Sequence, residues 1–411
     1  MAVPKIRFPE FTDDWEQRKL GDIASSFAYG LNAAAKEFDG KHKYLRITDI
    51  DDVSRVFQDD NLTSPDADID AADDYRLEEG DLLFARTGAS VGKSYIYKES
   101  DGLVYYAGFL IRAKIRPEYD AEFVFQNTLT STYEKYIKTT SQRSGQPGVN
   151  AKEYAEYSMS LPEYAEQVKI GMFLRKIDDA ITLHQRKLDD LRLLKKSMLQ
   201  KMFPKEGKDV PETRFPGFTD AWEQRKLSQI YSTIRNAFVG TATPYYVDDG
   251  HFYLESNNVK DGQINHNTEV FINDEFYKKQ KGKWLHTGDL VMVQSGHVGH
   301  TAVIPPELDN TAAHALIMFQ HPKQEIEPYF LNYELQTLSA KKKIADITTG
   351  NTIKHILASE MQEFVMDLPS ILEQRRIAAF FRQIDNTITL HQRKLEDLQK
   401  LKKALLQQMF C

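Results

Sequence analysis

The chain contains the same unit twice. Residues 7–23 read RFPEFTDDWEQRKLGDI and residues 214–230 read RFPGFTDAWEQRKLSQI, so 13 of 17 positions are identical at a shift of 207 residues. Residues 161–203 and 368–410 match at the same shift at 26 of 43 positions, and both contain the octapeptide ITLHQRKL. An internal repeat of this length determines the domain organisation before any single motif does. We therefore interpret the 411 residues as two copies of one unit, each with an opening motif, a divergent body and a closing segment.

The two closing segments are predicted to form long helices that pack against each other. Their apolar positions alternate in steps of four and three residues, which is the period of a coiled coil, and a Leu-Pro pair precedes each helix. The linker at 204–213 is too short for the return connection of a parallel pair, so we expect an antiparallel coiled coil that relates the copies by a pseudo-twofold axis. The predicted seam consists of Ile177, Ile181, His184, Leu188 and Leu191 in the first helix and Ile384, Ile388, His391, Leu395 and Leu398 in the second.

The bodies are predicted to have a mixed α/β fold with many short strands. Residues 105–115 and 313–320 have the pattern of buried strands, and residues 119–139 and 329–344 have that of helices with an apolar face. Trp15 and Trp222, in the opening motifs, are expected to anchor the cores. The predicted organisation is a first body at 1–160, a first helix at 161–205, a second body at 206–367 and a second helix at 368–411.

The distribution of charge keeps a nucleic-acid partner possible. The chain has 53 Lys and Arg against 60 Asp and Glu, a net charge of −7. The acidic residues are concentrated in the bodies, because residues 49–81 alone hold 13 of them, whereas each closing segment has a net charge of +4. The only cysteine is Cys411, and no apolar run approaches the roughly 20 residues of a membrane helix. We therefore expect a cytoplasmic protein with no disulfide framework and no membrane partner.

A glycine-containing turn occurs once in each copy. Residues 88–94, GASVGKS, have three residues between the glycines where a P-loop has four, and the equivalent SGHVGHT at 295–301 lacks the lysine. The motif therefore argues against a nucleotide-binding enzyme. Two interpretations stay open: a plain turn between strands, or a turn that brings cations to a DNA backbone or base edge.

A polar loop follows in each copy, at 143–150 and at 348–355. Both loops carry Gly, Gln or Asn and a cation, and such side chains can make paired hydrogen bonds to base edges. The alternative is a loop that packs beneath the start of the helix. The candidate DNA-contacting residues are Arg86, Thr87, Gly88, Lys93, Arg143, Gln146 and Asn150 in the first copy, and Ser295, His297, His300, Asn351 and Lys354 in the second.

The sequence predicts neither a catalytic centre nor a metal site. The carboxylates at 66–70 alternate as in a calcium loop, but no glycine or bidentate glutamate follows at the required spacing, so a solvated acidic loop is expected. His184 and His391 lie at seam positions, where a polar residue that determines register is the plainer interpretation than a metal ligand. We find no complete Walker loop and no nuclease carboxylate cluster.

In its duplicated architecture the chain resembles the specificity subunit of type I restriction-modification enzymes. The resemblance rests on RFPxFTDxWEQRKL at both body starts, GDLLFARTGASVG at 80–92 and the two helices with LPxxxEQ and ITLHQRKL, and it covers almost the whole chain. It implies that each body is a target-recognition domain that reads one half of a split sequence in double-stranded DNA. It implies that the helices set the spacing of the halves and bind two modification subunits, which carry S-adenosylmethionine and methylate adenine.

The resemblance also implies restriction subunits that use ATP and Mg²⁺ for translocation and cleavage, and no cofactor bound by this chain itself. The second glycine motif departs from the first, with Gln294 and His297 where the first has Arg86 and Ala89. Two other classes of protein remain as alternatives: a tandem DNA-binding module of another kind, such as a regulator, and a coiled-coil adaptor that binds no DNA. Only the DNA-binding classes predict an affinity that falls steeply with salt.

Overall fold

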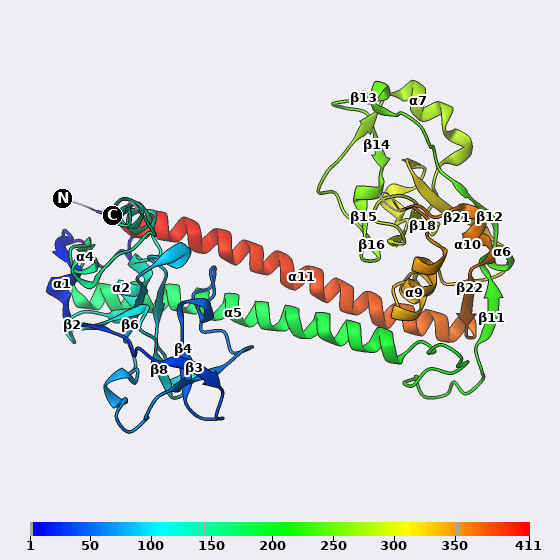
Figure 1. The fold of residues 1–411 in the computed structure, drawn as a ribbon. Helices are drawn as coiled ribbons and strands as arrows, with labels where there is room; N and C mark the ends of the chain where they lie inside the picture. The colour runs from blue at the N-terminus through cyan, green and yellow to red at the C-terminus, as the bar shows by residue number, and fades with distance from the viewer. Residues whose placement is uncertain (1–2, 144, 351–353) are drawn as a thin grey trace. The chain divides into compact units, whose positions relative to one another are not determined.

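The structure is a computed structural model that describes residues 3–143, 145–350 and 354–411. The described chain divides into two compact units (Figure 1). Unit 1 contains the residues up to Lys187 together with His391–Cys411, and unit 2 contains Leu188–Leu390. Each unit therefore combines one body with the first part of its own long helix and the last part of the long helix of the other copy.

The two long helices are α5, Tyr164–Lys201, and α11, Ile371–Met409. In unit 1, Asp178 of α5 pairs with Lys402 of α11, and His184 contacts His391, with 2.8 Å between their Nδ1 atoms. As residue numbers rise along α5 they fall along α11, so the helices run antiparallel in this unit. The structure thus confirms the predicted pairing of two long helices.

The same pairing recurs in unit 2. Lys195 of α5 lies 2.6 Å from Asp385 of α11, and the ring of Phe203 lies 6.0 Å from that of Phe381. Both helical lysines of these ion pairs occupy positions where the seam pattern calls for an apolar residue. A charge in a half-buried seam is costly without a counter-ion, and the aspartate of the facing helix supplies it.

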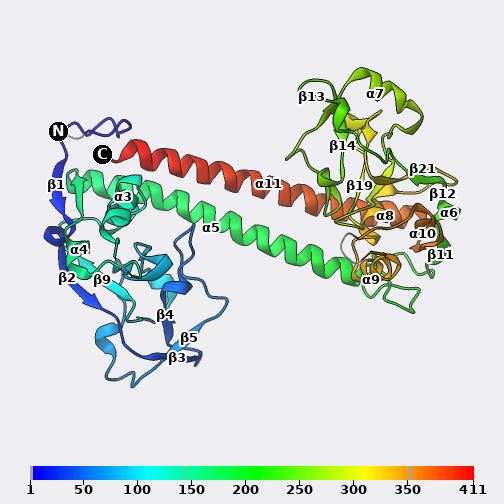
Figure 2. The same cartoon turned by 45° about the horizontal axis from the view of Figure 1, so that its top comes forward.

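Body 1 is built on a four-stranded antiparallel sheet with the strand order β2-β9-β6-β7. A two-stranded pair, β1 with β10, joins the opening motif to the start of α5, and smaller pairs lie on the side of the body away from α5 (Figure 2). The strands are β1 Glu16–Lys19, β2 Ala24–Tyr29, β3 Ala34–Glu37, β4 Lys43–Leu45, β5 Thr63–Asp66, β6 Leu82–Ala85, β7 Ser94–Ile96, β8 Val104–Tyr106, β9 Leu110–Ile115 and β10 Ser158–Leu161. The short helices are α1 Leu20–Ile23, α2 Ala121–Asn127, α3 Ser131–Thr140 and α4 Ala151–Ala155.

Body 2 repeats this plan with the strand order β12-β21-β18-β19 and with β11 paired to β22. Its strands are β11 Glu223–Lys226, β12 Tyr231–Asn236, β13 Tyr246–Val247, β14 His251–Leu254, β15 Val259–Lys260, β16 Gln263–Ile264, β17 Phe271–Ile272, β18 Leu290–Val293, β19 Thr301–Val303, β20 Ala312–Ala313, β21 Leu316–Pro322 and β22 Val365–Leu368. Its helices are α6 Leu227–Ile230, α7 Asp274–Lys279, α8 Pro328–Glu334, α9 Leu338–Ile347 and α10 Ala358–Glu363. The predicted mixed α/β bodies are confirmed.

The structure corrects the continuity of four predicted elements. The helix expected at 119–139 is two helices, because Thr130 accepts a hydrogen bond from the Tyr133 amide and caps a new helix, α3. Thr337 caps α9 in the same way, so the helix expected at 329–344 is also divided. The expected strand at 105–115 is interrupted between β8 and β9, and the strand at 313–320 breaks at Ala315, whose φ is +55°.

An aromatic cluster joins each body to the helix end of the other copy. In unit 1, the ring of Trp15 lies 5.7 Å from Phe123 and 6.4 Å from Phe410, the last aromatic residue after α11. In unit 2 the equivalent rings, Trp222, Phe330 and Phe203, meet at 5.4–5.9 Å. Both tryptophans are buried, which confirms their predicted role as core anchors.

A buried arginine–glutamate pair connects each opening motif to its own helix. Arg7 donates Nε and Nη2 to the two carboxylate oxygens of Glu166 at 2.7 Å, and Arg214 does the same to Glu373 at 2.6 and 2.7 Å. Both glutamates have fully buried side chains. Two parallel charge-assisted bonds give this contact its geometric specificity, so the arginine conserved between the two copies has a structural function.

Glu334 is a buried glutamate at a position where the core of unit 1 has an asparagine. Its equivalent in body 1 is Asn127, which accepts a hydrogen bond from the hydroxyl of Tyr157, whereas body 2 has Phe364 in place of that tyrosine. Glu334 accepts only the backbone N–H of Asp367, its Oε2 is buried without a partner, and burial raises the pKa of its carboxyl well above the ordinary value of 4.5.

We predict that Glu334→Gln stabilises unit 2 increasingly as the pH rises. The folded state holds the proton of Glu334 more tightly than the unfolded chain, so the wild type loses stability as the pH climbs from 4.5 towards the folded pKa, and the glutamine variant does not. Thermal denaturation of both proteins between pH 5 and 8 measures this. A difference in Tm that is the same at every pH would contradict it.

Candidate functional site

In body 1 the two segments predicted to contact DNA lie together. The Gly88 amide donates to the Pro147 carbonyl at 3.0 Å, and the Val149 amide donates to the Arg86 carbonyl at 2.9 Å. An antiparallel bridge between Thr87 and Gly148 completes the pairing. The turn after β6 and the loop before α4 therefore form one continuous surface, which we call loop pair 1, residues 86–92 with the described part of 143–150.

Body 2 contains the equivalent arrangement, loop pair 2, formed by residues 294–299 and the described part of 348–356. The Gly296 amide donates to the Lys354 carbonyl at 3.1 Å, and the Ile356 amide donates to the Gln294 carbonyl at 3.0 Å. Of the predicted contact residues, Ser295, His297 and Lys354 belong to this pair, and Asn351 lies outside the described residues.

The glycines of the turn are required by its geometry. Gly88 and Gly92 have φ of +73° and +83°, and a Cβ on Gly92 would lie 2.5 Å from the Ile137 side chain. Four amides of the turn already have backbone partners, since Gly88 donates to Pro147, Val91 to Gly88, Gly92 to Ala85 and Lys93 to Ser90. The turn does not present the row of free N–H groups with which a P-loop holds phosphates.

Lys93 and His300 hold the turn in place in the two bodies. Lys93 is only 7 % exposed, and its Nζ donates to the Ile50 carbonyl at 2.9 Å and lies 2.6 Å from Asp52 Oδ1. In body 2, Nδ1 of His300 accepts the Asp261 amide at 3.3 Å, and burial lowers the pKa of His300, which favours the neutral acceptor form. A direct DNA contact by either side chain stays a prediction, and for Lys93 it would require this ion pair to open.

Arg143 and Asn150 also make structural contacts. Asn150 Oδ1 accepts the Glu153 amide at 3.0 Å and caps α4, and the Arg143 guanidinium bonds to the Thr140 carbonyl at 2.7 Å and pairs with Glu153. Both side chains therefore shape the polar loop of body 1. Gln146 lies exposed at the tip of the same loop, and a Cβ on Gly88 would lie 3.1 Å from its Nε2.

Sequence reasoning missed two aromatic residues beside loop pair 1. The Arg86 guanidinium lies 4.9 Å from the ring centre of Tyr29, and the Arg86 amide donates to the carbonyl of Phe109, whose side chain is 59 % exposed. Tyr29 and Phe109 belong to the end of β2 and the break before β9. Neither lies in a recognisable motif, so only the fold reveals that Tyr29 lies against the guanidinium and that Phe109 bonds to the Arg86 backbone.

The same backbone carries different side chains in the two bodies. The backbone N–H of Gln294 donates to the Ala315 carbonyl, as the backbone N–H of Arg86 does to the Phe109 carbonyl. Asn236 occupies the position of Tyr29 at the end of the equivalent strand. His297, which is exposed, stands where the first copy has Ala89. Loop pair 1 is thus a cationic and aromatic surface, whereas loop pair 2 is built from amides and histidine.

The helix seam is polar at the His184–His391 contact. One ring must donate and the other accept across 2.8 Å, so at least one imidazole is neutral, and burial together with His391, Lys187 and Lys394 lowers the pKa of His184. No group of three or more potential metal ligands occurs among the described residues. The seam residues Ile177, Ile181, Leu188, Ile384 and Leu395 are buried, and Leu191, Ile388 and Leu398 are partly buried.

The chain has two tandem bodies joined to two paired helices. The bodies present matched loop pairs with different side chains, which is the arrangement of a recognition protein with two binding surfaces. The family model of the type I restriction modification DNA specificity domain matches the chain twice, over residues 12–193 and 220–400. The chain belongs to this family, and its role is the recognition of DNA sequence and not catalysis.

Individual relatives agree with this assignment. The chain is 23 % identical to the type I restriction enzyme MjaVIII specificity subunit of Methanocaldococcus jannaschii over 98 % of this chain and 92 % of that protein. It is 25 % identical to the putative MjaX specificity subunit of the same organism, over 98 % and 94 %. The crystal structure of the type I restriction-modification S subunit from M. genitalium has the same fold, with a TM-score of 0.69, 12 % identity and coverage of 100 % and 99 %. No helix in the described part of the chain is long and apolar enough to cross a membrane.

We predict that Lys93→Ala lowers the stability of unit 1 by about 1–3 kcal/mol, because the buried bond to the Ile50 carbonyl is lost. Lys354→Ala is the matched control: its side chain is exposed on loop pair 2, so its Tm should stay that of the wild type. Thermal denaturation compares the two variants. A Lys93→Ala protein with unchanged Tm would show that the lysine is not needed to hold the turn.

Proposed function

We propose that this chain reads the two halves of a split, asymmetric sequence in double-stranded DNA, one half with each body. The observation that carries the proposal is the recurrence of one loop pair on two equivalent scaffolds with different side chains. Arg86 and Gln146 in body 1, and Gln294 and His297 in body 2, are side-chain types that bond to base edges. Two bodies with identical loop pairs would instead read a palindrome.

The proposal assigns the chemistry to partner proteins. Two modification subunits would bind S-adenosylmethionine and methylate the DNA, and restriction subunits would use ATP and Mg²⁺, while this chain binds neither cofactor. Exposed leucines at equivalent positions of the two helices support docking there: Leu183 and Leu390, and Leu194 and Leu401, are 40–67 % exposed. The support is their recurrence at equivalent positions of both helices, because exposed apolar surface becomes an interaction site when it forms a patch.

Salt dependence separates this function from that of an adaptor that binds no DNA. The complex of the chain with a modification subunit should bind its target DNA with an affinity that falls about a thousandfold between 50 and 200 mM salt. Fluorescence anisotropy with a labelled duplex measures this. An affinity that does not change with salt, or no binding to any duplex, would contradict the proposal.

We further predict that the length of the paired helices determines the length of the spacer between the two half-sequences, so that the helices act as a ruler. Seven residues inserted after Lys187 in α5 and seven after Leu390 in α11 leave the contacts within each unit intact and keep the heptad pattern. Each insertion adds about 10 Å of helix, which equals about three base pairs of DNA. The methylated target should keep both half-sequences and gain about three base pairs of spacer. An unchanged spacer would contradict the ruler.

A further inference from the structure

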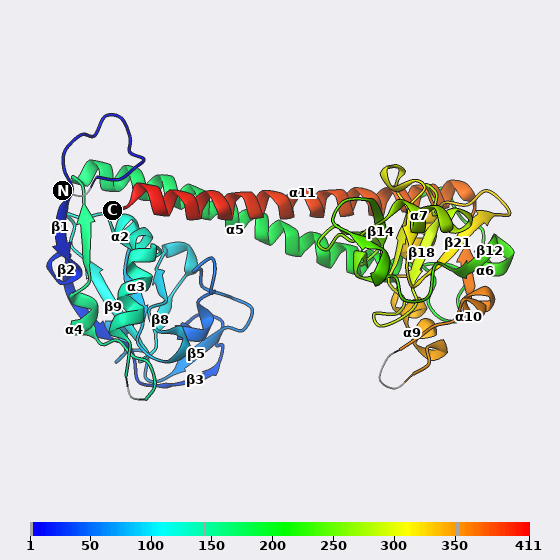
Figure 3. The same ribbon diagram turned by 90° about the horizontal axis from the view of Figure 1, so that it is seen from above.

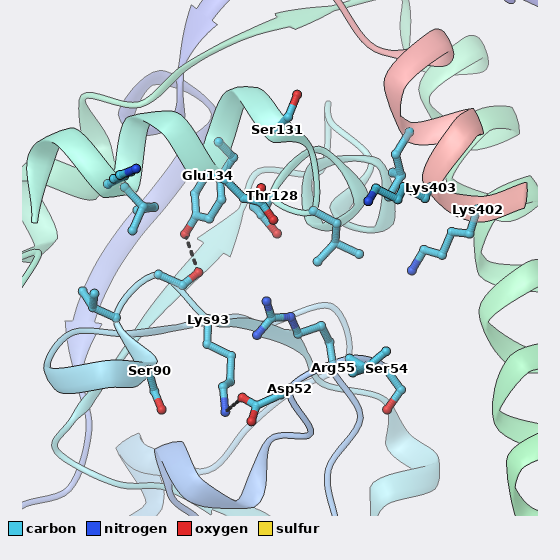
Figure 4. Close-up of a pocket in the computed structure, with 18 of the residues that line it drawn as sticks. Asp52, Ser54, Arg55, Ser90, Lys93, Thr128, Ser131, Glu134, Lys402 and Lys403 are labelled. Atoms are coloured by element: carbon cyan, nitrogen blue, oxygen red, sulfur yellow. Dashed lines mark hydrogen bonds and ion pairs between the residues drawn. The ribbon is translucent and has the colours of Figure 1, made fainter. Parts of the chain in front are cut away.

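Unit 1 contains a cavity of about 700 Å³ between body 1 and the last turns of α11 (Figure 4). Figure 3 shows the ribbon of body 1 beside the end of α11. Its walls are the loop at 52–55, the glycine turn at 89–93, α3, and the facing stretches of α5 and α11. This volume lies within the range of about 300–1,000 Å³ of pockets that hold small ligands. Of the loop pairs and the helix seam, only residues 89–92 and Ile181 line the cavity.

The cavity has an excess of positive charge. Its lining contains five cations and three carboxylates, namely Arg55, Lys93, Lys138, Lys402 and Lys403 against Asp52, Glu134 and Asp178. Lys93 is neutralised by Asp52, and Lys402 by Asp178. Arg55, Lys138 and Lys403 then remain with Glu134 as the only other carboxylate of the lining.

Arg55 is the least expected member of this lining. Its φ of +60° places a bulky residue in the left-handed region, where strain accumulates at functional positions. Burial lowers the pKa of its guanidinium, and the attraction of Asp52 and Glu134 offsets this only in part. Within the described chain no carboxylate lies at ion-pair distance from it, so a strained backbone holds a desolvated guanidinium in a cavity that an anion can fill.

The opposite walls complete a site of mixed character. Figure 4 shows Arg55 on one wall and Lys402 and Lys403, from α11, on the other. Tyr133 and Ile137 of α3 contribute buried apolar surface beside these cations. A ligand that fits must therefore combine an anionic group with a planar or apolar part.

We propose that this cavity binds a phosphate group attached to a nucleotide, with Arg55 and Lys403 as the phosphate contacts. The phosphate can come from a free nucleotide or from the DNA backbone, and the shared chemistry is a phosphate held by a guanidinium and an ammonium. The glycine turn contributes only a wall, because the amides of Gly88, Val91, Gly92 and Lys93 already have backbone partners. Bound ligand would connect body 1 to α11 and so stabilise unit 1.

The site belongs to unit 1 and has no counterpart in the sequence of body 2. At the shift of 207 residues, Thr128 and Ser131 of the lining become Leu335 and Leu338, and Tyr133 becomes Ala340. These changes remove hydroxyl groups and the ring from the equivalent wall. A ligand of this cavity is thus expected to bind once per chain.

The test uses the full chain, titrated with inorganic phosphate, AMP and ADP by calorimetry and thermal shift, and separately with duplex DNA. If free nucleotide is the source, the wild type binds AMP or ADP, and Arg55→Gln and Lys403→Gln each weaken this at least about tenfold. Lys400→Gln, an exposed lysine of α11 outside the lining, should bind as the wild type does. If the DNA backbone is the source, nucleotides do not bind. The slope of log affinity for DNA against log salt concentration then falls in magnitude by about one in each of the two variants, and the preferred sequence stays the same.

Arg55→Gly provides a readout that does not depend on the fold of the glutamine variants. Glycine adopts the left-handed backbone without strain, so this variant should have a higher Tm than the wild type and yet lose the phosphate contact. The proposal is overturned if Arg55 and Lys403 variants leave both nucleotide binding and the DNA salt slope unchanged. The assignment of DNA recognition to the loop pairs would survive that result, because sequence preference is measured separately.

Discussion

The exchange of helix ends between the two copies is the contact on which the rest of the structure depends. Each body is completed by the end of a helix that belongs to the other copy, through a Trp-Phe-Phe cluster and a lysine–aspartate pair. The aromatic rings bury apolar surface. The ion pair favours the antiparallel orientation of the two helices, because a lysine at a seam position is tolerated only where the aspartate of the antiparallel partner faces it. The fold of either unit is therefore inseparable from the pairing of α5 with α11.

This arrangement separates what must be constant from what can vary. The opening motif, the arginine–glutamate pair and the helix seam recur in both units with nearly the same geometry, while the loop pairs keep a backbone and change their side chains. Arg86 beside Tyr29 and Phe109 in one body corresponds to Gln294 beside Asn236 and Ala315 in the other. Recognition can thus diverge without any change to the residues that hold the units together.

Much of this was predictable from the sequence because it is periodic or duplicated. The 207-residue shift, the seam pattern and the short linker predicted two bodies and two antiparallel helices, and the strand and helix patterns predicted the mixed α/β fold of the bodies. The breaks at Thr130 and Thr337 were not, because a threonine that caps a helix looks like any other threonine until the chain turns there.

The site was predictable in its loops but not in its chemistry. The glycine turn and the polar loop were identified separately, and the structure shows that they share one surface. Lys93 stood out in the sequence as a candidate contact and proves to be tied to Ile50 and Asp52. Arg55 had no signal at all, since neither its positive φ nor the cavity it lines is visible in a single sequence.

The most direct test of the account is the exchange of body 1. Residues 24–160 are replaced by the body of another family member, the chain is expressed with a modification subunit, and the methylated sites of the cellular DNA are mapped. The account predicts that one half of the target changes while the other half keeps the wild-type sequence. A change in both halves would contradict the claim that each body reads its half alone.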